Sequence, residues 1–398
     1  MTTRLGRPAL LREFNERAVF EAVRAGHPIS RAELARRLGL SKPTVSAALG
    51  NLLDAGLVRE AETEPGARTY GATFYRPSAE AAHVFALDIG GRYLRAALAA
   101  LDGTVVARED VEIAGARVVD VIAQALRLRD RLLRRAGLAP TDVEAAVVGV
   151  PGVVDRTGRV RLSDSVADLE GARLGEQLAA ALGLTVLVEN DVNLATLAEH
   201  HYGAARDVED FAFLSIGTGT GAGLVLRGEL HRGANGLAGE VDFAIDRDTG
   251  GDRPCGAHPH DPCVASFTWQ AEEWIAEQRP AETTTVLAAP TTPEAIFSAA
   301  RAGDLLGLRL VAEEARRIAV YAAPIAAVVD VDLIVLGGDI GLNGDLLLEP
   351  VRTELARRHP YPPRVTTSEL ADHAVLDGAI VLGIQTTLEI VLLRHLRR

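Results

Sequence analysis

Two groups of residues have the types and spacing that chemistry at a protein site requires, and the first resembles a metal loop. Cys255-Gly-Ala-His-Pro-His-Asp-Pro-Cys263 holds both cysteines of the 398-residue chain and two of its ten histidines. Thiolates and imidazoles are the ligands that zinc prefers, so Cys255, His258, His260 and Cys263 are candidate ligands of a tetrahedral S2N2 site. Two prolines make this a short and stiff span in which to enclose an ion. The stretch is therefore a working metal site, a remodelled metal loop or a polar loop.

The second group consists of two glycine-rich turns that each follow an apolar segment, at Asp88-Ile-Gly-Gly91 and at Gly217-Thr-Gly-Thr-Gly-Ala-Gly223. Glycine lets a backbone approach a phosphate closely, and threonine adds a hydroxyl donor. The spacing matches neither the dinucleotide fingerprint nor the Walker loop. Because an acid at a strand end accompanies these turns, we predict a nucleotide cleft between two lobes. The candidate phosphate-binding residues are Asp88, Gly90, Gly91, Thr218, Gly219, Gly337 and Gly338.

These residues need a scaffold that brings distant strand ends together, and the chain beyond Ala82 has the pattern of one. Apolar segments that end in Gly or Asp alternate with helical stretches, as in "AAVVGVPGVVD", "LTVLVENDVN" and "DLIVLGGDI". This alternation is typical of α/β folds, whose ligands lie at the carboxyl ends of strands. The Asp102-Gly103 pair predicts a hairpin between two early strands.

The first 60 residues differ in charge from the rest of the chain. They hold ten Lys and Arg against six Asp and Glu, a net of +4, and since the whole chain carries −12, the remainder carries −16. A small basic segment joined to a large acidic one favours a part that meets a polyanion. The only lysine, Lys42, lies in that basic segment.

Helix signals divide the basic segment into three helices. Apolar residues at helical spacing predict the first helix over residues 11–25, and they are Phe14, Val19, Phe20 and Val23. Ser30, with Glu33 three residues further on, predicts a capping box at the start of the second helix. Ser41 is the predicted N-cap of the third helix.

The second and third of these helices, joined by a tight turn, predict a helix-turn-helix. The third helix would enter the major groove of DNA N-terminus first, where hydroxyls and a cation reach bases and phosphates. Two strands and a wing are expected to follow it. The alternative is a generic three-helix bundle with a solvated charged face. The candidate DNA-binding residues are Ser41, Lys42, Thr44, Ser46 and Arg68.

The chain resembles the ROK family of repressors and sugar kinases, in particular its xylose-repressor-like transcriptional regulators. The resemblance rests on "LDIGG", "GVPGVVD", "ENDVN", "GTGTGAG", "GANGLAGEVDF" and "VLGGDI" in this order, and it covers nearly the whole chain. It implies an α/β fold in which a winged helix-turn-helix precedes a two-lobed, actin-like ATPase domain. The expected boundaries are residues 1–80 for the DNA-binding domain and 83–398 for the ROK domain, with a small lobe over 83–197 plus 380–398 and a large lobe over 198–379.

The resemblance also implies roles for single residues. Asp191 matches the general base of the family's kinases, while Asn190 and Glu240 match contacts to sugar hydroxyls. We therefore expect these three residues to form an effector site in which Asp191 is a vestigial catalytic residue. The alternative is that Asn190 and Asp191 only cap the helix that begins there, since both residue types do this well.

Several family positions carry other residues in this chain. The His that binds sugar and zinc in the family is Phe243, the first cysteine of the zinc loop is Arg253, and the Glu after its last cysteine is Ala265. The Thr expected after "DIGG" is Arg92. Each loss removes a hydroxyl contact or a metal ligand, and polar pairs in such a site discriminate steeply. The cofactor stays unknown: structural zinc is one alternative, at a family site that is degraded.

These features favour a transcriptional regulator, a repressor of carbohydrate-related genes, over an enzyme. The expected partners are double-stranded DNA with an inverted-repeat operator, a sugar-type effector, and further copies of the chain in a homodimer or tetramer. An active ATP-dependent sugar kinase with an accessory head is the alternative, and a scaffold that has lost its ligand is a third. The N-terminus has no signal-peptide core and we expect no membrane span, so a cytoplasmic location is predicted.

Overall fold

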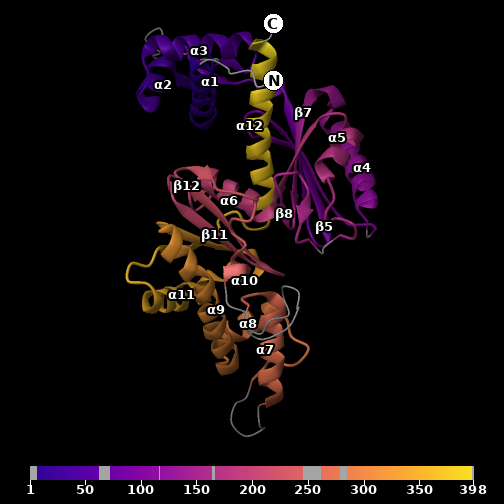
Figure 1. The fold of residues 1–398 in the computed structure, drawn as a ribbon, viewed down its shortest axis with the longest axis vertical. Coiled ribbons are helices and arrows are strands. Elements are labelled where there is room, and N and C mark those ends of the chain that lie inside the picture. The colour runs from indigo at the N-terminus through magenta and orange to yellow at the C-terminus, as the bar shows by residue number, and fades with distance from the viewer. Residues whose placement is uncertain are drawn as a thin grey trace.

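The computed structural model describes residues 7–61, 72–115, 117–163, 166–244, 261–277 and 285–396. The molecule is elongated, with the N-terminal helices and both chain ends at one end of its long axis (Figure 1). Its architecture confirms the predicted fold class, because a small head of helices and strands is followed by two sheets that are each covered by helices.

The head consists of three helices and a small antiparallel sheet. Its helices are α1 (Arg7–Gly26), α2 (Arg31–Leu38) and α3 (Lys42–Asp54). Its strands, in the order in which they pair, are β1 (Ile29–Ser30), β3 (Phe74–Pro77) and β2 (Val58–Glu60). Helices α2 and α3 with this sheet make the winged helix-turn-helix that the caps predicted.

The start and end of α2 show how the sequence fixes the turn between the two helices. The Ser30 side chain accepts a hydrogen bond from the backbone N of Glu33 at 3.3 Å, as predicted. The reciprocal half of the capping box was wrong, because the Glu33 carboxylate binds Arg36 and Arg37 instead. Gly39 then ends the helix in the left-handed region, with a φ of 63°.

The core of the head joins α1 to α3. Val45, Leu49 and Leu52 of α3 are buried, and they belong to the same apolar cluster as Phe20 of α1. Phe14, the first apolar residue of the predicted spacing, is 69% exposed. The inward face of α1 therefore begins one turn later than its apolar spacing indicated.

The first sheet of the body has five strands and helices on both faces. Its strands, in the order in which they pair, are β10 (Thr185–Asn190), β7 (Val143–Val150), β4 (His83–Ile89), β5 (Tyr93–Ala100) and β6 (Val105–Glu112). One face carries α4 (Val118–Ala136) and α5 (Leu174–Leu182), and the other carries α6 (Asp191–His201) and α12 (Ala374–Leu396). The predicted hairpin joins β5 to β6, with Gly103 at a φ of 92°.

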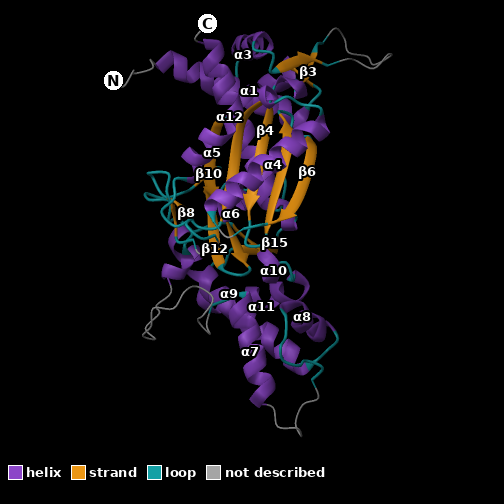
Figure 2. Cartoon of the chain, turned by 90° about the vertical axis from the view of Figure 1, so that its right-hand side faces the viewer, coloured by secondary structure: helices purple, strands orange, loops and turns teal. Residues whose placement is uncertain are grey.

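The second sheet also has five strands and is covered by helices, one of which, α6, it shares with the first sheet. Its strands, in pairing order, are β13 (Glu229–Leu230), β12 (Thr220–Leu226), β11 (Phe211–Ile216), β14 (Leu333–Gly337) and β15 (Arg364–Thr367). One face packs on α6, so that α6 contacts both sheets (Figure 2). The remaining elements include α7 (Val264–Glu277), α8 (Pro293–Arg301), α9 (Leu305–Val329), α10 (Gly338–Gly341), α11 (Gly344–Arg358) and the small ribbon β8 (Val153–Val154) with β9 (Val160–Arg161).

Helix α12 runs from the space between the sheets to the head (Figure 1). Residues Ala374–Arg394 are long and apolar enough to cross a membrane, yet more than half of that span is buried against protein. Leu376, Ile380 and Leu388 belong to the same apolar cluster as Val84 of β4. The composition of α12 is therefore that of a core helix.

Candidate functional site

Asn190 joins β10 to α6 and is held by two hydrogen bonds. Its Oδ1 accepts from the backbone N of Asn193 at 2.9 Å, which makes it the N-cap of α6. Its Nδ2 donates to the carbonyl oxygen of Gly152 at 3.0 Å. The helix-cap interpretation is therefore correct for Asn190. A sugar contact is left the remaining lone pair of Oδ1 and the second N–H of Nδ2.

Asp191 forms the first turn of α6, where its Oδ1 accepts from the backbone N of Val192 at 2.8 Å. Burial raises the pKa of Asp191 to about 7, and the nearby charges of Asp88 and Glu240 raise it as well. Coulombic repulsion of this kind requires the groups to lie near one another. Strands β4, β7 and β10 are parallel neighbours, so the ends of β4 and β10 place Asp88 and Asp191 at one edge of the first sheet, and Glu240 acts on the same carboxylate. We call the region of these three carboxylates the acidic cleft.

Asp88 lies at the end of β4, on the first-sheet side of the acidic cleft. Arg95 Nη1 donates to its Oδ2 at 3.1 Å. Burial raises the pKa of Asp88 to about 6, although the charge of Arg95 lowers it. The following turn is tight, because Gly90 N donates to the carbonyl of Tyr93 at 3.0 Å, and Gly91 is exposed. A cation is thus already present beside the strand-end acid.

The glycine-rich turns of the second sheet lie beside each other, because β11 and β14 are parallel neighbours. Gly338 has a φ of 76°, and a Cβ there would overlap the carbonyl of Ile216. Only glycine fits that position. Thr218 is exposed on the turn that follows β11. The structure thus brings residues 217–219 next to residues 337–338, as a phosphate-binding surface requires.

The segment from His231 to Glu240, which carries one of the three carboxylates, packs against β8 and the end of β10. Gly236 has a φ of 82° and approaches the carbonyl of Val154 so closely that a Cβ would overlap it. Arg232 forms an ion pair with the buried carboxylate of Glu189, which also accepts from Asn193 Nδ2 at 2.9 Å. This pair ties the segment to the end of β10. Sequence reasoning missed it, although an acid inside a strand that precedes a helix requires a cation or donors.

Three of the residues that depart from the family pattern are turned to solvent. Arg92 is exposed and pairs with Glu112 of β6 at 2.7 Å. Phe243 is 72% exposed, and Ala265 is also exposed. Arg92 therefore supplies no hydroxyl in place of threonine, and its charge is engaged outside the acidic cleft.

The candidate zinc ligands are described only in part. Cys255, His258 and His260, like Arg253, lie outside the described residues. Cys263 is fully buried, donates from Sγ to Ser266 Oγ at 3.4 Å, and has a pKa that burial raises. Within the described ranges no group of three or more His, Cys, Asp or Glu is placed to hold a metal.

Hydrogen bonds hold the described end of this loop. The Tyr321 hydroxyl of α9 donates to Asp261 Oδ1 at 2.5 Å. Thr220 Oγ1 donates to the carbonyl of Pro262 at 2.9 Å, and Val264 N donates to the carbonyl of Gly217 at 2.9 Å. These bonds fix the start of α7 against the turn that follows β11 without using a side chain of the proposed metal set.

The recognition helix α3 carries one polar residue that caps it and others that do not. Ser41 is its N-cap and accepts from Thr44 N at 3.2 Å, and the two hydroxyls lie 2.8 Å apart. Lys42 is exposed and Ser46 is half-buried. Ser41 therefore has a structural role in addition to any contact with DNA. Arg68 lies outside the described residues.

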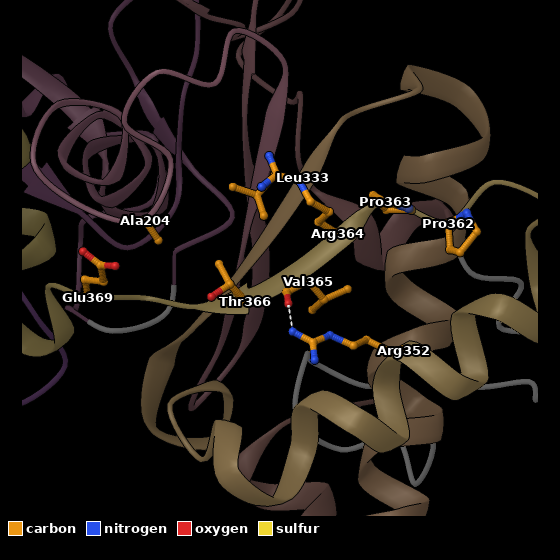
Figure 3. A pocket seen from close by; sticks show the side chains of 9 residues that line it. All are labelled: Ala204, Leu333, Arg352, Pro362, Pro363, Arg364, Val365, Thr366 and Glu369. Carbon is orange, nitrogen blue, oxygen red and sulfur yellow. Dashed lines mark hydrogen bonds between the residues drawn. The ribbon is translucent and has the colours of Figure 1, made fainter.

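A cavity of about 520 Å³ lies away from the acidic cleft, beside β15 (Figure 3). Arg352 Nη2 donates to the carbonyl of Val365 at its edge at 2.7 Å. None of the predicted site residues lines it. Its lining is Ala204, Leu333, Arg352, Pro362, Pro363, Arg364, Val365, Thr366 and Glu369.

Comparison with known proteins gives two family matches. The ROK family profile matches residues 84–386, and a MarR family profile matches residues 14–69. The first match spans most of the chain and contains the acidic cleft. The second contains helices α2 and α3.

Individual relatives fall into two groups. The chain is 25% identical to a xylose repressor of Caldicellulosiruptor bescii over 96% of this chain and 98% of that protein. It is 31% identical to a beta-glucoside kinase of Listeria monocytogenes, but over only 58% of this chain and 73% of the kinase. A solved ROK family transcriptional regulator, a homolog of the E. coli MLC protein, has a TM-score of 0.79 at 24% identity and covers 97% of this chain and 98% of its own.

Proposed function

Since the chain belongs to the ROK family and begins with a winged helix-turn-helix, we propose that it is a sugar-responsive transcriptional regulator, a repressor of carbohydrate-related genes. One observation carries the proposal. The xylose repressor aligns over nearly the full length of both chains, head included, whereas the beta-glucoside kinase aligns with little more than half of this chain.

In this proposal the head, residues 1–80, binds double-stranded DNA. Lys42 at the N-terminus of α3 reaches a phosphate, and Thr44 and Ser46 read base edges, with Ser41 and Arg68 contacting the backbone. One small head makes few phosphate contacts, so two heads of a homodimer or tetramer read an inverted repeat. Because its proposed partner is DNA, the proposal includes a location in the cytoplasm.

The body, residues 83–398, binds a sugar or sugar derivative in the acidic cleft. Asp191 and Glu240 accept hydrogen bonds from hydroxyls, and Asn190 contributes through its amide. The glycine-rich turns at residues 217–219 and 337–338 are the remaining part of a phosphate-binding surface. The boundary between a small lobe (83–197 plus 380–398) and a large lobe (198–379) passes through α6 and α12.

The proposal is tested with the full chain and DNA from upstream of its neighbouring genes. Fluorescence anisotropy should show specific binding that D-xylose or D-glucose changes. Specific binding that neither these sugars nor a wider panel of carbohydrates alters would leave a DNA-binding protein and remove the effector from the proposal.

A second candidate function, ATP-dependent sugar phosphorylation, is favoured by the retained Asp191 beside the glycine-rich turns. A carboxylate there could take a hydroxyl proton as phosphoryl transfer proceeds. We propose that the chain is not an enzyme, because Arg92 and Phe243 stand where the family places a hydroxyl and an imidazole, and catalysis depends on close positioning. Turnover of ATP with a sugar at enzyme-like rates, abolished in Asp191→Asn, would reverse this ranking.

A further inference from the structure

Helix α6 has one end in the acidic cleft and the other end against the head. Asp191 is its first residue and Tyr202 is its C-cap residue. At 1.5 Å per residue, its 11 residues span about 16 Å. We infer that α6 is a lever that carries the state of the cleft to the head, with Tyr202 and Arg24 as the positioning residues at its far end. The inference rests on the proposed function.

The joint between α6 and the head is a partly buried hydrogen bond. Arg24 Nη1, on α1, donates to the Tyr202 hydroxyl at 2.9 Å, and Arg24 also pairs with Glu21 at 2.9 Å. The Arg24 side chain is only 9% exposed. A guanidinium in such surroundings is stabilised by its partners and is costly without them. Gly103, at the tip of the β5–β6 hairpin, lies next to both groups.

Close packing prevents α6 from moving alone. Gly378 of α12 touches the backbone of α6 at Leu194, and a Cβ at this glycine would overlap the Leu194 carbonyl. On another side Gly223 of β12 touches Thr196, whose hydroxyl donates to the carbonyl of Val192 at 2.7 Å. Protein interiors of this density transmit displacements. A shift at the cleft end of α6 therefore reaches α12 and Tyr202 together.

Helix α12 gives the lever a second connection to the head. Its Glu389 pairs with Arg17 of α1 at 3.2 Å, and its Leu388 and Leu392 share an apolar cluster with Phe20 of α1. The same cluster contains Leu49 of the recognition helix. Because α1 packs on α3, movement of α1 changes the orientation of the DNA-reading surface. The two connections, at Arg24 and at Arg17, both lie on α1.

The test removes only the hydroxyl of the joint, with Tyr202→Phe in the full chain. Tyr361→Phe is the matched control, because it removes the same atom from a side chain that is 84% exposed. Hydrogen–deuterium exchange is measured over α1, residues 11–26, without ligand. We expect exchange in α1 to be about fivefold faster in Tyr202→Phe, the factor that loss of one ordinary hydrogen bond produces, and unchanged in Tyr361→Phe. If exchange in α1 is equal in wild type and Tyr202→Phe, the hydrogen bond between Arg24 and Tyr202 does not stabilise α1 and the inference is wrong.

The coupling itself is tested with D-xylose and D-glucose as probes. Calorimetry identifies a sugar that binds, and that sugar should bind wild type and Tyr202→Phe equally while altering exchange in α1 of the wild type only. A bound sugar that alters α1 to the same extent in both proteins, or in neither, overturns the lever. If neither sugar binds, the proposed effector has failed, and the comparison without ligand still decides the joint.

Discussion

The recognition helix and the acidic cleft hold their polar groups in opposite ways. Lys42 at the start of α3 is exposed, and within the described part of the chain it takes part in no ion pair. In the cleft, Asp88 is buried against Arg95, and Asn190 is engaged by a helix cap and a backbone carbonyl. Lys42 of the head is thus available to an external partner, whereas the polar groups of the cleft already have hydrogen-bond or ion-pair partners within the protein.

This difference indicates which ligand each region suits. A free, exposed cation gains most from a polyanion, whose counterions are released on binding. Buried carboxylates with raised pKa values instead favour a neutral ligand that offers hydroxyl donors, because a further anion would add repulsion. We therefore expect binding by the head to depend on salt and binding by the cleft to depend on pH.

The largest expected effect is on the cleft. Asp191→Ala should lower sugar affinity about 100-fold, because a carboxylate that accepts from two hydroxyls contributes two charge-assisted hydrogen bonds. Calorimetric titration measures it, with Asp54→Ala, an exposed acid of the head, as the control. Sugar affinity that stays within about twofold of wild type would remove Asp191 from the site and leave it as a helix-start residue only.

The next effect belongs to the head. Lys42→Ala should weaken binding to every DNA sequence about tenfold at low salt and reduce the slope of log affinity against log salt by about 1.8, because each of the two bound heads loses one phosphate contact. Arg127→Ala, an exposed cation on α4, is the matched control and should change neither quantity. An unchanged salt slope in Lys42→Ala would mean that α3 does not enter the groove by its N-terminus.

The expected effect of pH on sugar affinity is smaller, and it concerns the acidic cleft but not the head. Burial raises the pKa of Asp191 to about 7, above its value in the unfolded chain, so its contribution to stability is fully present below about pH 4 and is lost as the pH rises through about 7. If the ionised form binds hydroxyls, sugar affinity should rise about fourfold from pH 6.5 to 8. Asp191→Asn should abolish this rise. A pH dependence that survives in Asp191→Asn would assign it to another group, such as Asp88.

Much of the fold could be predicted from local sequence signals, whereas the hydrogen-bond and ion-pair partners of individual side chains could not. Ser30, Ser41 and the hairpin at Gly103 were predictable because caps and turns depend on a few neighbouring residues. The pairing of Arg232 with Glu189, 43 residues apart, depends on how two sheets meet. No local pattern encodes that meeting.

The same distinction explains the errors in the head. The apolar spacing of α1 includes Phe14, whose side chain is exposed, because burial also depends on where the neighbouring elements end. Glu33 has the type that a capping box needs, yet Arg36 and Arg37 compete for its carboxylate. In both cases the local pattern was present, but tertiary or electrostatic partners determined where the side chain lies.

The smallest expected effect tests whether Cys263 is a core residue or a metal ligand. Its thiol is fully buried and donates to Ser266, so Cys263→Ala should lower the free energy of unfolding by about 1–2 kcal/mol, through lost contacts and one weak hydrogen bond. For a domain of this size that is a fall in Tm of about 2–4 °C, measured by calorimetry. Cys255→Ser is the matched control, and metal analysis accompanies both variants. If the loop is remodelled, zinc content is the same in wild type and in Cys263→Ala. If wild type carries one zinc per chain and both variants lose it, the two thiolates are ligands and the loop is a working metal site after all.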